Sequence, residues 1–218
     1  MLLHGFTGGP FEVEPLADHL TSRGWNCRIP LLPGHGDDSL PLERVNRADW
    51  LSKAADEAEQ LCRAYGEIDL VGFSMGGLIS IYLANRFPVR RLVLLGVPYI
   101  YVSPGRFIRE FARHTGERDW SELRTVRTTP LSATWQFTRL VHETKRELPL
   151  VQVPTFIAQG ERDHVIHPAS ARFIVRRMVN KPELHFLPNS RHRICLESDA
   201  PHLFRLVERF FDQGVAAY

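Results

Sequence analysis

The sequence contains little cysteine, no excess of charge of one sign and no long apolar run. Its three cysteines, Cys27, Cys62 and Cys195, lie far apart, which argues against a disulfide framework and gives no metal-site spacing. The formal net charge of +2 gives no electrostatic reason to expect nucleic acid or a membrane surface as a partner. No apolar run approaches a membrane span, and the few residues before His4 leave no room for a secretory signal. We therefore expect a soluble cytoplasmic protein that holds no metal.

What the sequence does contain is a regular alternation of short apolar runs and helix-like segments. Its 218 residues, 44% of them hydrophobic, suffice for one large domain with a substantial core. Strands are predicted at 1–3, 25–31, 68–71, 91–96, 153–159 and 183–187. Helices are predicted at 13–23, from a cap at Asp49 to Gly66, at 78–85, at 168–179 and from about Pro201. This alternation indicates an α/β fold, with a mostly parallel central sheet of about six strands and helices on both faces.

The alternation stops between residues 98 and 150, where aromatic residues are mixed with many charges. Two or three helices fit this segment, near 106–113 and 131–147. We interpret 98–150 as a small inserted helical cap subdomain, with 1–97 and 151–218 forming the core. Its aromatic residues could line an acyl pocket, although ordinary packing within the cap is the favoured interpretation for each one. They are Tyr99, Tyr101, Phe107, Phe111, Trp120, Trp135 and Phe137.

One stretch, Gly72-Phe73-Ser74-Met75-Gly76, has the pattern G-x-S-x-G between a predicted strand and a predicted helix. In that context the chain turns sharply, and the serine hydroxyl is exposed at the carboxyl end of the strand. Such a turn requires residues without side chains on both sides of the serine, which Gly72 and Gly76 provide. The alternative is a structural serine in a glycine-rich turn. The pattern alone favours a catalytic Ser74 only about two to one.

A serine hydroxyl is a weak nucleophile unless a base accepts its proton, and histidine is the usual base near neutral pH. The base in turn needs an acid to fix its tautomer. Asp163 follows the predicted strand 153–159, and His192 follows the predicted strand 183–187. Because parallel strands end at the same edge of a sheet, both side chains are expected near Ser74. His164 and His167 are weaker candidates for the base, because they share the loop of Asp163.

Other polar residues have structural interpretations that we prefer. Glu197 and Asp199 compete with Asp163 for the role of acid, but they lie beyond the His192 loop and are typical of a helix start. His35 could be a ligand, yet a buried histidine that fixes a loop by hydrogen bonds is the favoured interpretation, and His4 is interpreted in the same way.

Five segments together resemble the α/β-hydrolase superfamily, in particular small bacterial carboxylesterases and monoacylglycerol lipases. They are HGFTG at 4–8, PGHG at 33–36, GFSMGG at 72–77, GERDHVIHP at 160–168 and NSRH at 189–192. They cover most of the chain in the order of that family. The resemblance implies that Ser74 is the nucleophile, His192 the general base and Asp163 its orienting acid. It also implies that the backbone N–H groups of Phe6 and Met75 form an oxyanion hole.

The resemblance also implies that amino-terminal strands of the family are missing, since only three residues precede His4. Either the start has been assigned too late, which we favour, or the chain tolerates a reduced sheet. Our hypothesis is a serine carboxylesterase that hydrolyses short- to medium-chain esters through an acyl-enzyme, without cofactor or metal. Alternatives are a monoacylglycerol lipase or lysophospholipase, another hydrolase chemistry of the fold, or a catalytically silent ligand-binding relative. The sequence leaves the oligomeric state open.

Overall fold

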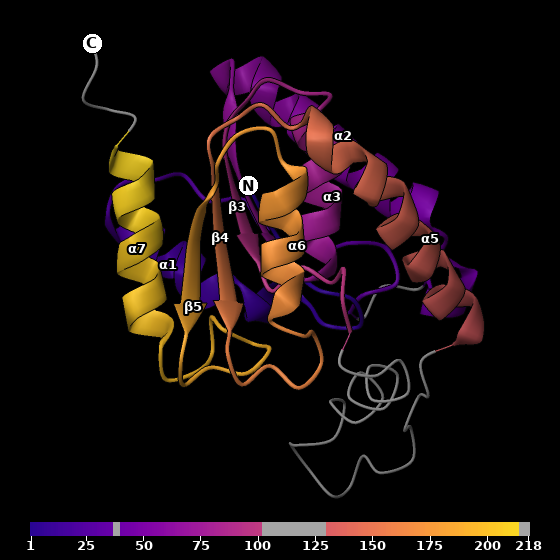
Figure 1. Cartoon of the computed structure of the whole chain (residues 1–218). Helices are drawn as coiled ribbons and strands as arrows, with labels where there is room; N and C mark the ends of the chain where they lie inside the picture. The colour runs from indigo at the N-terminus through magenta and orange to yellow at the C-terminus, as the bar shows by residue number, and fades with distance from the viewer. Residues whose placement is uncertain (37–39, 102–129, 214–218) are drawn as a thin grey trace, which may run out of the picture.

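A five-stranded parallel sheet, in the order β1-β2-β3-β4-β5, lies at the centre of the computed structural model, which describes residues 1–36, 40–101 and 130–213 (Figure 1). Its strands are β1 (Leu2–Leu3), β2 (Ile68–Phe73), β3 (Val89–Leu95), β4 (Thr155–Gly160) and β5 (Glu183–Leu187). Since every pair is parallel, all five strands end at the same edge of the sheet. The predicted α/β fold is confirmed.

Helices cover both faces of this sheet (Figure 1). The helices are α1 (Glu14–Ser22), α2 (Arg47–Tyr65), α3 (Met75–Ala84), α5 (Leu131–Glu147), α6 (Ala169–Arg177) and α7 (Ala200–Asp212). Short 3₁₀ helices are η1 (Pro10–Glu12), η2 (Leu42–Arg44) and η4 (Leu148–Leu150). Helices α1 and α7 pack on one face, whereas α2, α3 and α6 pack on the other, with α5 against α3.

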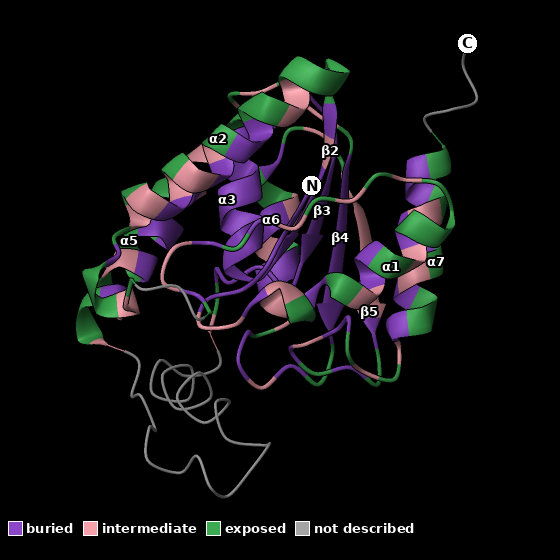
Figure 2. Cartoon of the chain, turned by 180° about the vertical axis from the view of Figure 1, so that it is seen from behind, coloured by how far each residue is buried: buried purple, intermediate pink, exposed green. Residues whose placement is uncertain are grey.

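The strands in the middle of the sheet are largely apolar on both sides because each face of the sheet contributes to a separate core. In β3, Leu92 and Leu94 pack in the core under α3, whereas Val93 and Leu95 pack in the core under α7. All four side chains are fully buried. Figure 2 shows the same division, with buried strands in the middle and helices whose outer faces are exposed. This burial explains why the second half of β3, in the middle of the sheet, is a continuous apolar run rather than an alternating pattern.

The described residues form five strands, close to the predicted count of about six, and the strand predicted at 25–31 does not form. This segment runs beside β1, and the Leu2 N–H donates to the Arg28 carbonyl at 2.8 Å. Since β1 has only two residues, it offers few backbone groups with which 25–31 could form a ladder of hydrogen bonds. The apolar character of 25–31 therefore reflects packing against the core around α1 and α7 rather than pairing in the sheet.

The N-cap of helix α2 lies three residues before the predicted cap at Asp49. The N-cap is Asn46, whose side chain accepts a hydrogen bond from the Ala48 N–H at 2.8 Å. Asp49 lies at the third helical position and its carboxylate accepts the Asn46 N–H at 2.8 Å. The two residues form a capping box, in which an acidic third residue is as typical as the cap itself.

Part of the predicted cap subdomain lies outside the described residues, including the helix near 106–113 and the aromatic residues Phe107, Phe111 and Trp120. The described helix α5 has the predicted bounds and packs directly on α3 and α2. The Tyr99 hydroxyl donates to Thr144 Oγ1 of α5 at 3.0 Å. The division into a core and a cap subdomain stays a prediction. Among the helices that the structure describes, none is long and apolar enough to cross a bilayer.

Candidate active site

Ser74 lies in a sharp turn between β2 and α3. Its backbone has φ 51° and ψ −115°, and its N–H donates to the Leu95 carbonyl of β3 at 2.8 Å. A methyl group at Gly72 would lie 2.4 Å from the Gly76 carbonyl oxygen, and one at Gly76 would lie 2.2 Å from the Leu3 carbonyl oxygen. Both glycines of the pattern therefore occupy positions where the backbone leaves no space for a side chain.

The close approach at Gly76 gives a prediction for stability. A Gly76→Ala substitution would press its Cβ against the Leu3 backbone, which cannot move aside as a flexible side chain can. We expect a destabilisation of about 3 kcal/mol, the upper end of the usual cost of overpacking. In a chain of this size that corresponds to a Tm lower by roughly 6–12 °C in thermal unfolding.

Gly9→Ala is the matched control for this prediction. A methyl group at Gly9 would contact only the Phe11 ring, at 3.4 Å, and the backbone there is extended, with φ −168°. It should change Tm by no more than about 2 °C. Equal effects of the two substitutions would contradict the packing that we describe between α3 and β1.

Three predicted side chains from the ends of three strands meet at one point. His192 Nε2 lies 3.2 Å from Ser74 Oγ, and His192 Nδ1 lies 2.8 Å from Asp163 Oδ2. All three residues are buried, at 0%, 7% and 5% exposure for Ser74, His192 and Asp163. With Nδ1–H donating to the carboxylate, Nε2 is left as the acceptor for the serine hydroxyl. The arrangement can pass a proton from Ser74 to His192.

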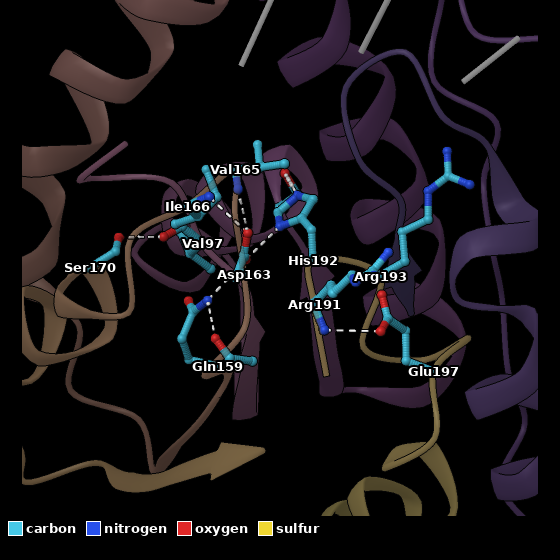
Figure 3. Close-up of polar contacts among 12 residues, drawn as sticks. Val97, Gln159, Asp163, Val165, Ile166, Ser170, Arg191, His192, Arg193 and Glu197 are labelled. Atoms are coloured by element: carbon cyan, nitrogen blue, oxygen red, sulfur yellow. Dashed lines mark hydrogen bonds and ion pairs between the residues drawn. The ribbon is translucent and has the colours of Figure 1, made fainter. Parts of the chain in front are cut away.

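The Asp163 carboxylate is held by four hydrogen bonds (Figure 3). Oδ1 accepts the N–H groups of Val165 and Ile166 at 2.9 and 2.8 Å, while Oδ2 accepts His192 Nδ1–H and Gln159 Nε2–H, the latter at 2.9 Å. Burial alone would raise the pKa of Asp163. The His192 charge and hydrogen bond, together with the two amides, instead lower this pKa. The carboxylate is therefore ionised and fixed in orientation.

Opposing effects also set the pKa of His192. Burial alone would lower it, but the Asp163 charge and hydrogen bond outweigh burial and raise the pKa above 6.5. The ring also packs on Phe73, with centroids 5.1 Å apart. A histidine with a raised pKa is a stronger base toward Ser74 once it is neutral.

The loop that carries His192 is tied down by the two residues that we interpreted as helix-start acids. Glu197 accepts the Arg191 N–H at 2.9 Å (Figure 3), and Asp199 accepts the Asn189 N–H at 2.8 Å and the Ser190 hydroxyl at 3.0 Å. Asp199 precedes α7 but makes no side-chain cap to it. Asp199 therefore lies at the helix start as predicted, and its carbonyl accepts the His202 and Leu203 N–H groups, but its carboxylate binds the preceding loop instead of capping α7.

The predicted oxyanion-hole residues lie on adjoining elements. Met75 is the first residue of α3, so its N–H has no partner within the helix. Phe6 follows β1, where the first turn of α3 approaches the backbone of Leu3 and His4. The Phe6 ring is fully buried and stacks on Phe137 of α5, with centroids 5.0 Å apart. These positions are compatible with the predicted pair of donors, whose role stays a prediction.

Comparison with known proteins agrees with this geometry. A protein-family model described as "Alpha/beta hydrolase family" matches residues 1–205, most of the chain. The chain belongs to the α/β-hydrolase family. The resemblance noted from the sequence motifs is thereby confirmed.

Relatives of this α/β-hydrolase cover nearly its whole length. It is 27% identical to a carboxylesterase of Bacillus subtilis (strain 168), over 98% of this chain and 92% of the relative. It is 29% identical to a thermostable monoacylglycerol lipase of Bacillus sp. (strain H-257), over 97% of this chain and 89% of the relative. A solved structure from a study of two metagenome-derived lipolytic enzymes, LipS and LipT, matches with a TM-score of 0.81 at 22% identity, over 97% of this chain and 92% of that one. That likeness supports the fold.

Backbone strain in this α/β-hydrolase occurs at the predicted nucleophile and next to Phe6, a predicted oxyanion-hole residue. Among the described residues, Thr7 and Ser74 are the non-glycine residues with positive φ, at 62° and 51°. Thr7 directly follows Phe6. For a β-branched residue this conformation is costly and persists only where the surroundings impose it. The strain therefore supports a functional role for both turns.

The other histidines near the site have structural contacts. His4 Nε2 accepts the Leu32 N–H at 3.1 Å, so its Nδ1–H donates to the Gly5 carbonyl at 3.0 Å. His35 Nδ1 lies 2.9 Å from the Pro33 carbonyl oxygen. Burial lowers the pKa of both rings to about 4. Two neutral histidines that fix the loops after β1 agree with the structural interpretation. His167, which shares the loop of Asp163, accepts the Ala169 N–H at 3.1 Å.

A cavity of about 600 Å³ lies elsewhere, at the amino end of the sheet. Its walls include Met1, Ile68 and Asp69, at the starts of β1 and β2, whereas Ser74 follows the end of β2. The cavity is therefore separate from the candidate site. Within the described part of the chain, no group of three or more His, Cys, Asp or Glu residues could hold a metal ion.

The sequence motifs did not reveal two polar residues of the site. Gln159 binds the Asp163 carboxylate, and Glu12 binds the loop that carries Phe6. Gln159 is the second-to-last residue of the buried strand β4, and a polar residue in such a run is the signal that could have found it. Glu12 has no comparable signal, because its neighbours Phe11, Val13 and Glu14 suggest only the exposed start of a helix.

Proposed function

We propose that this protein is a serine carboxylesterase that hydrolyses carboxylic esters of short to medium acyl chains through an acyl-enzyme. The coarser class, an ester-hydrolysing serine hydrolase, follows from its family and from the relatives named carboxylesterase and monoacylglycerol lipase. The observation that carries the finer proposal is the hydrogen-bonded chain Ser74–His192–Asp163, buried at the strand ends. That chain supplies the activated nucleophile that an acyl-enzyme requires.

In the first half of the reaction, Ser74 Oγ attacks the ester carbonyl carbon while His192 Nε2 takes the hydroxyl proton. Asp163 keeps the other ring proton on Nδ1 and stabilises the imidazolium that forms. The carbonyl oxygen becomes an oxyanion, which the N–H groups of Phe6 and Met75 stabilise. The intermediate collapses, and the alcohol leaves with the proton from His192.

In the second half, His192 takes a proton from water, and the resulting hydroxide attacks the acyl-enzyme. The same oxyanion donors serve again. Collapse of this intermediate breaks the Ser74 ester bond and releases the acid, and His192 returns the proton to Ser74 Oγ. Each turnover consumes one ester and one water, and no cofactor takes part.

The test is a panel of p-nitrophenyl esters from acetate to palmitate, combined with labelling by a fluorophosphonate. We expect the highest kcat/KM between C2 and C8, and one label per chain on the peptide that contains Ser74. Only an activated serine reacts with this probe, so an unlabelled protein would be a catalytically silent relative and would end the proposal.

A second candidate function is hydrolysis of monoacylglycerols with long acyl chains. It is favoured by the similarity to the thermostable monoacylglycerol lipase of Bacillus sp. (strain H-257). The same residues would perform the same steps, and only the acyl-binding surface would differ. A rate that increases steadily to C12 and beyond, together with turnover of monooleoylglycerol, would decide for this alternative.

The raised pKa of His192 predicts the direction of the pH dependence. Only neutral His192 can accept the Ser74 proton, so kcat/KM is lost as pH falls through the pKa of the folded enzyme. Burial opposes the shift but the Asp163 charge and hydrogen bond prevail, so this pKa lies above 6.5. Initial rates with p-nitrophenyl butyrate from pH 5 to 9 should therefore increase with pH and reach half their maximum above pH 6.5. A midpoint well below 6.5 would contradict the electrostatics of the site.

A further inference from the structure

Glu12 is a buried carboxylate next to the site that the mechanism above does not use. It ends the short helix η1, between the Phe6 loop and α1, and is 4% exposed. Burial raises its pKa, and hydrogen bonds and nearby positive charge offset part of that effect. A carboxyl group is costly to bury unless its partners compensate, so the contacts of Glu12 identify what it stabilises.

The first set of contacts is with the Phe6 loop. Glu12 Oε2 accepts the Gly5 N–H at 2.9 Å, and hydrogen bonding from the Gly9 amide also lowers the pKa of Glu12. The loop wraps closely around the carboxylate. A methyl group at Gly8 would lie 2.1 Å from Oε2, and one at Gly5 would lie 3.0 Å from it. Glu12 therefore fixes the backbone on both sides of Phe6.

The second set of contacts is with the His192 loop. Arg193 Nε lies 3.8 Å from Glu12 Oε1, and Arg193 directly follows the histidine. The charge of Glu12 also acts on the His192 ring and raises its pKa, in addition to the larger effect of Asp163. Among the charged groups of the described residues, Asp163 and Glu12 favour the imidazolium form of His192, and Arg193 disfavours it.

We propose that Glu12 is a positioning residue of the reaction, which ties the Phe6 loop to the His192 loop and adds a second negative charge beside the imidazolium. The proposal rests on the proposed function of Ser74 and His192. It gives the buried charge two separable roles. One is the hydrogen bond to Gly5, which orients the backbone at Phe6. The other is electrostatic and does not depend on that bond.

Two substitutions separate these roles. Glu12→Gln keeps an acceptor for the Gly5 N–H but removes the charge. We expect its pH midpoint for the rate of fluorophosphonate labelling to fall by roughly 0.5–1 unit, the scale on which one nearby charge shifts a pKa. The plateau rate should fall roughly three- to tenfold, the rate equivalent of that shift.

Glu12→Asp keeps the charge but withdraws the carboxylate from Gly5. Its pH midpoint should stay close to that of the parent. Its plateau rate should fall at least roughly threefold, because the backbone donor at Phe6 is displaced.

Glu14→Gln is the matched control, because it makes the same chemical change two residues away on the exposed start of α1. It should leave both the midpoint and the plateau unchanged. Thermal melts show whether each variant folds. If Glu12→Gln does not fold, Glu12→Asp still tests the tie to Gly5, and a parent-like plateau rate in Glu12→Asp overturns the proposal.

The outcomes distinguish a failure of the proposed function from a failure of the role of Glu12 alone. A parent protein that is not labelled at Ser74 defeats the proposed function, and the role of Glu12 with it. A parent that is labelled, with folded Glu12→Gln and Glu12→Asp that match it in midpoint and plateau, leaves the proposed function intact and overturns only the role of Glu12. A midpoint shift in Glu12→Gln that Glu14→Gln does not share supports the electrostatic role.

Discussion

Ser74→Ala is expected to abolish ester hydrolysis, with a fall in kcat/KM of roughly four to six orders of magnitude. The substitution removes the oxygen that forms the acyl-enzyme in the proposed mechanism, while His192 and Asp163 keep their contact. Any remaining rate would come from water activated by His192 and from oxyanion stabilisation. The only side-chain hydrogen bond that the structure describes for Ser74 is to His192, so Tm should change little. The measurement is hydrolysis of p-nitrophenyl butyrate at pH 8 with purified variants, together with thermal melts.

Ser80→Ala is the matched control for this experiment. Ser80 lies on the same helix, α3, and is fully buried, and its hydroxyl has no hydrogen-bond partner among the described residues. Removing an unsatisfied buried hydroxyl is neutral or stabilising. Activity should stay within about twofold of the parent, as for other substitutions away from a functional contact. If Ser74→Ala turned over substrate at the parent rate, the nucleophile would have to lie elsewhere.

The positions of Ser74, Asp163 and His192 could be predicted because they depend on local patterns. Ser74 and Asp163 follow short, mostly apolar runs that can be recognised as buried strands, and His192 follows the segment Glu183–Leu187, in which apolar and polar residues largely alternate. Parallel strands bring their carboxyl ends together without any knowledge of the loops. The glycines around Ser74 are also local, since the turn and the helix start that require them are adjacent in sequence. The sequence is therefore sufficient to predict the site residues whose positions are set by their neighbours in the chain.

The features that could not be predicted depend on partners far apart in sequence. Residues 25–31 have the composition of a strand, but whether they pair is decided by the length of β1, which lies at the opposite end of α1. Asp199 lies where a helix cap is expected, yet its carboxylate binds a loop ten residues earlier. Glu12 resembles a surface acid until the fold places Gly5 and Arg193 around it. Contacts between residues so far apart in sequence can be recognised only once the fold is known.

Asp163→Asn is expected to reduce kcat roughly 10³- to 10⁴-fold, although it changes little in size. Four donors converge on the native carboxylate: His192 Nδ1–H, Gln159 Nε2–H and the Val165 and Ile166 amides. Asparagine has a single acceptor oxygen. If that oxygen stays with the two amides, its NH₂ group faces His192 Nδ1, which then accepts a hydrogen bond and moves its proton to Nε2. Nε2–H cannot take a proton from Ser74.

Asp199→Asn separates this effect from simple loss of a carboxylate near the His192 loop. Asp199 accepts hydrogen bonds from Asn189 and Ser190, so it acts on His192 through the loop that carries this histidine. We expect a loss below about tenfold in kcat, because only the rigidity of the loop changes. The measurement is kcat for both variants over pH 6–9, together with Tm. If Asp199→Asn loses more activity than Asp163→Asn, the acid that orients His192 has been assigned to the wrong residue. Asp163 would then not be the group that keeps the proton on His192 Nδ1.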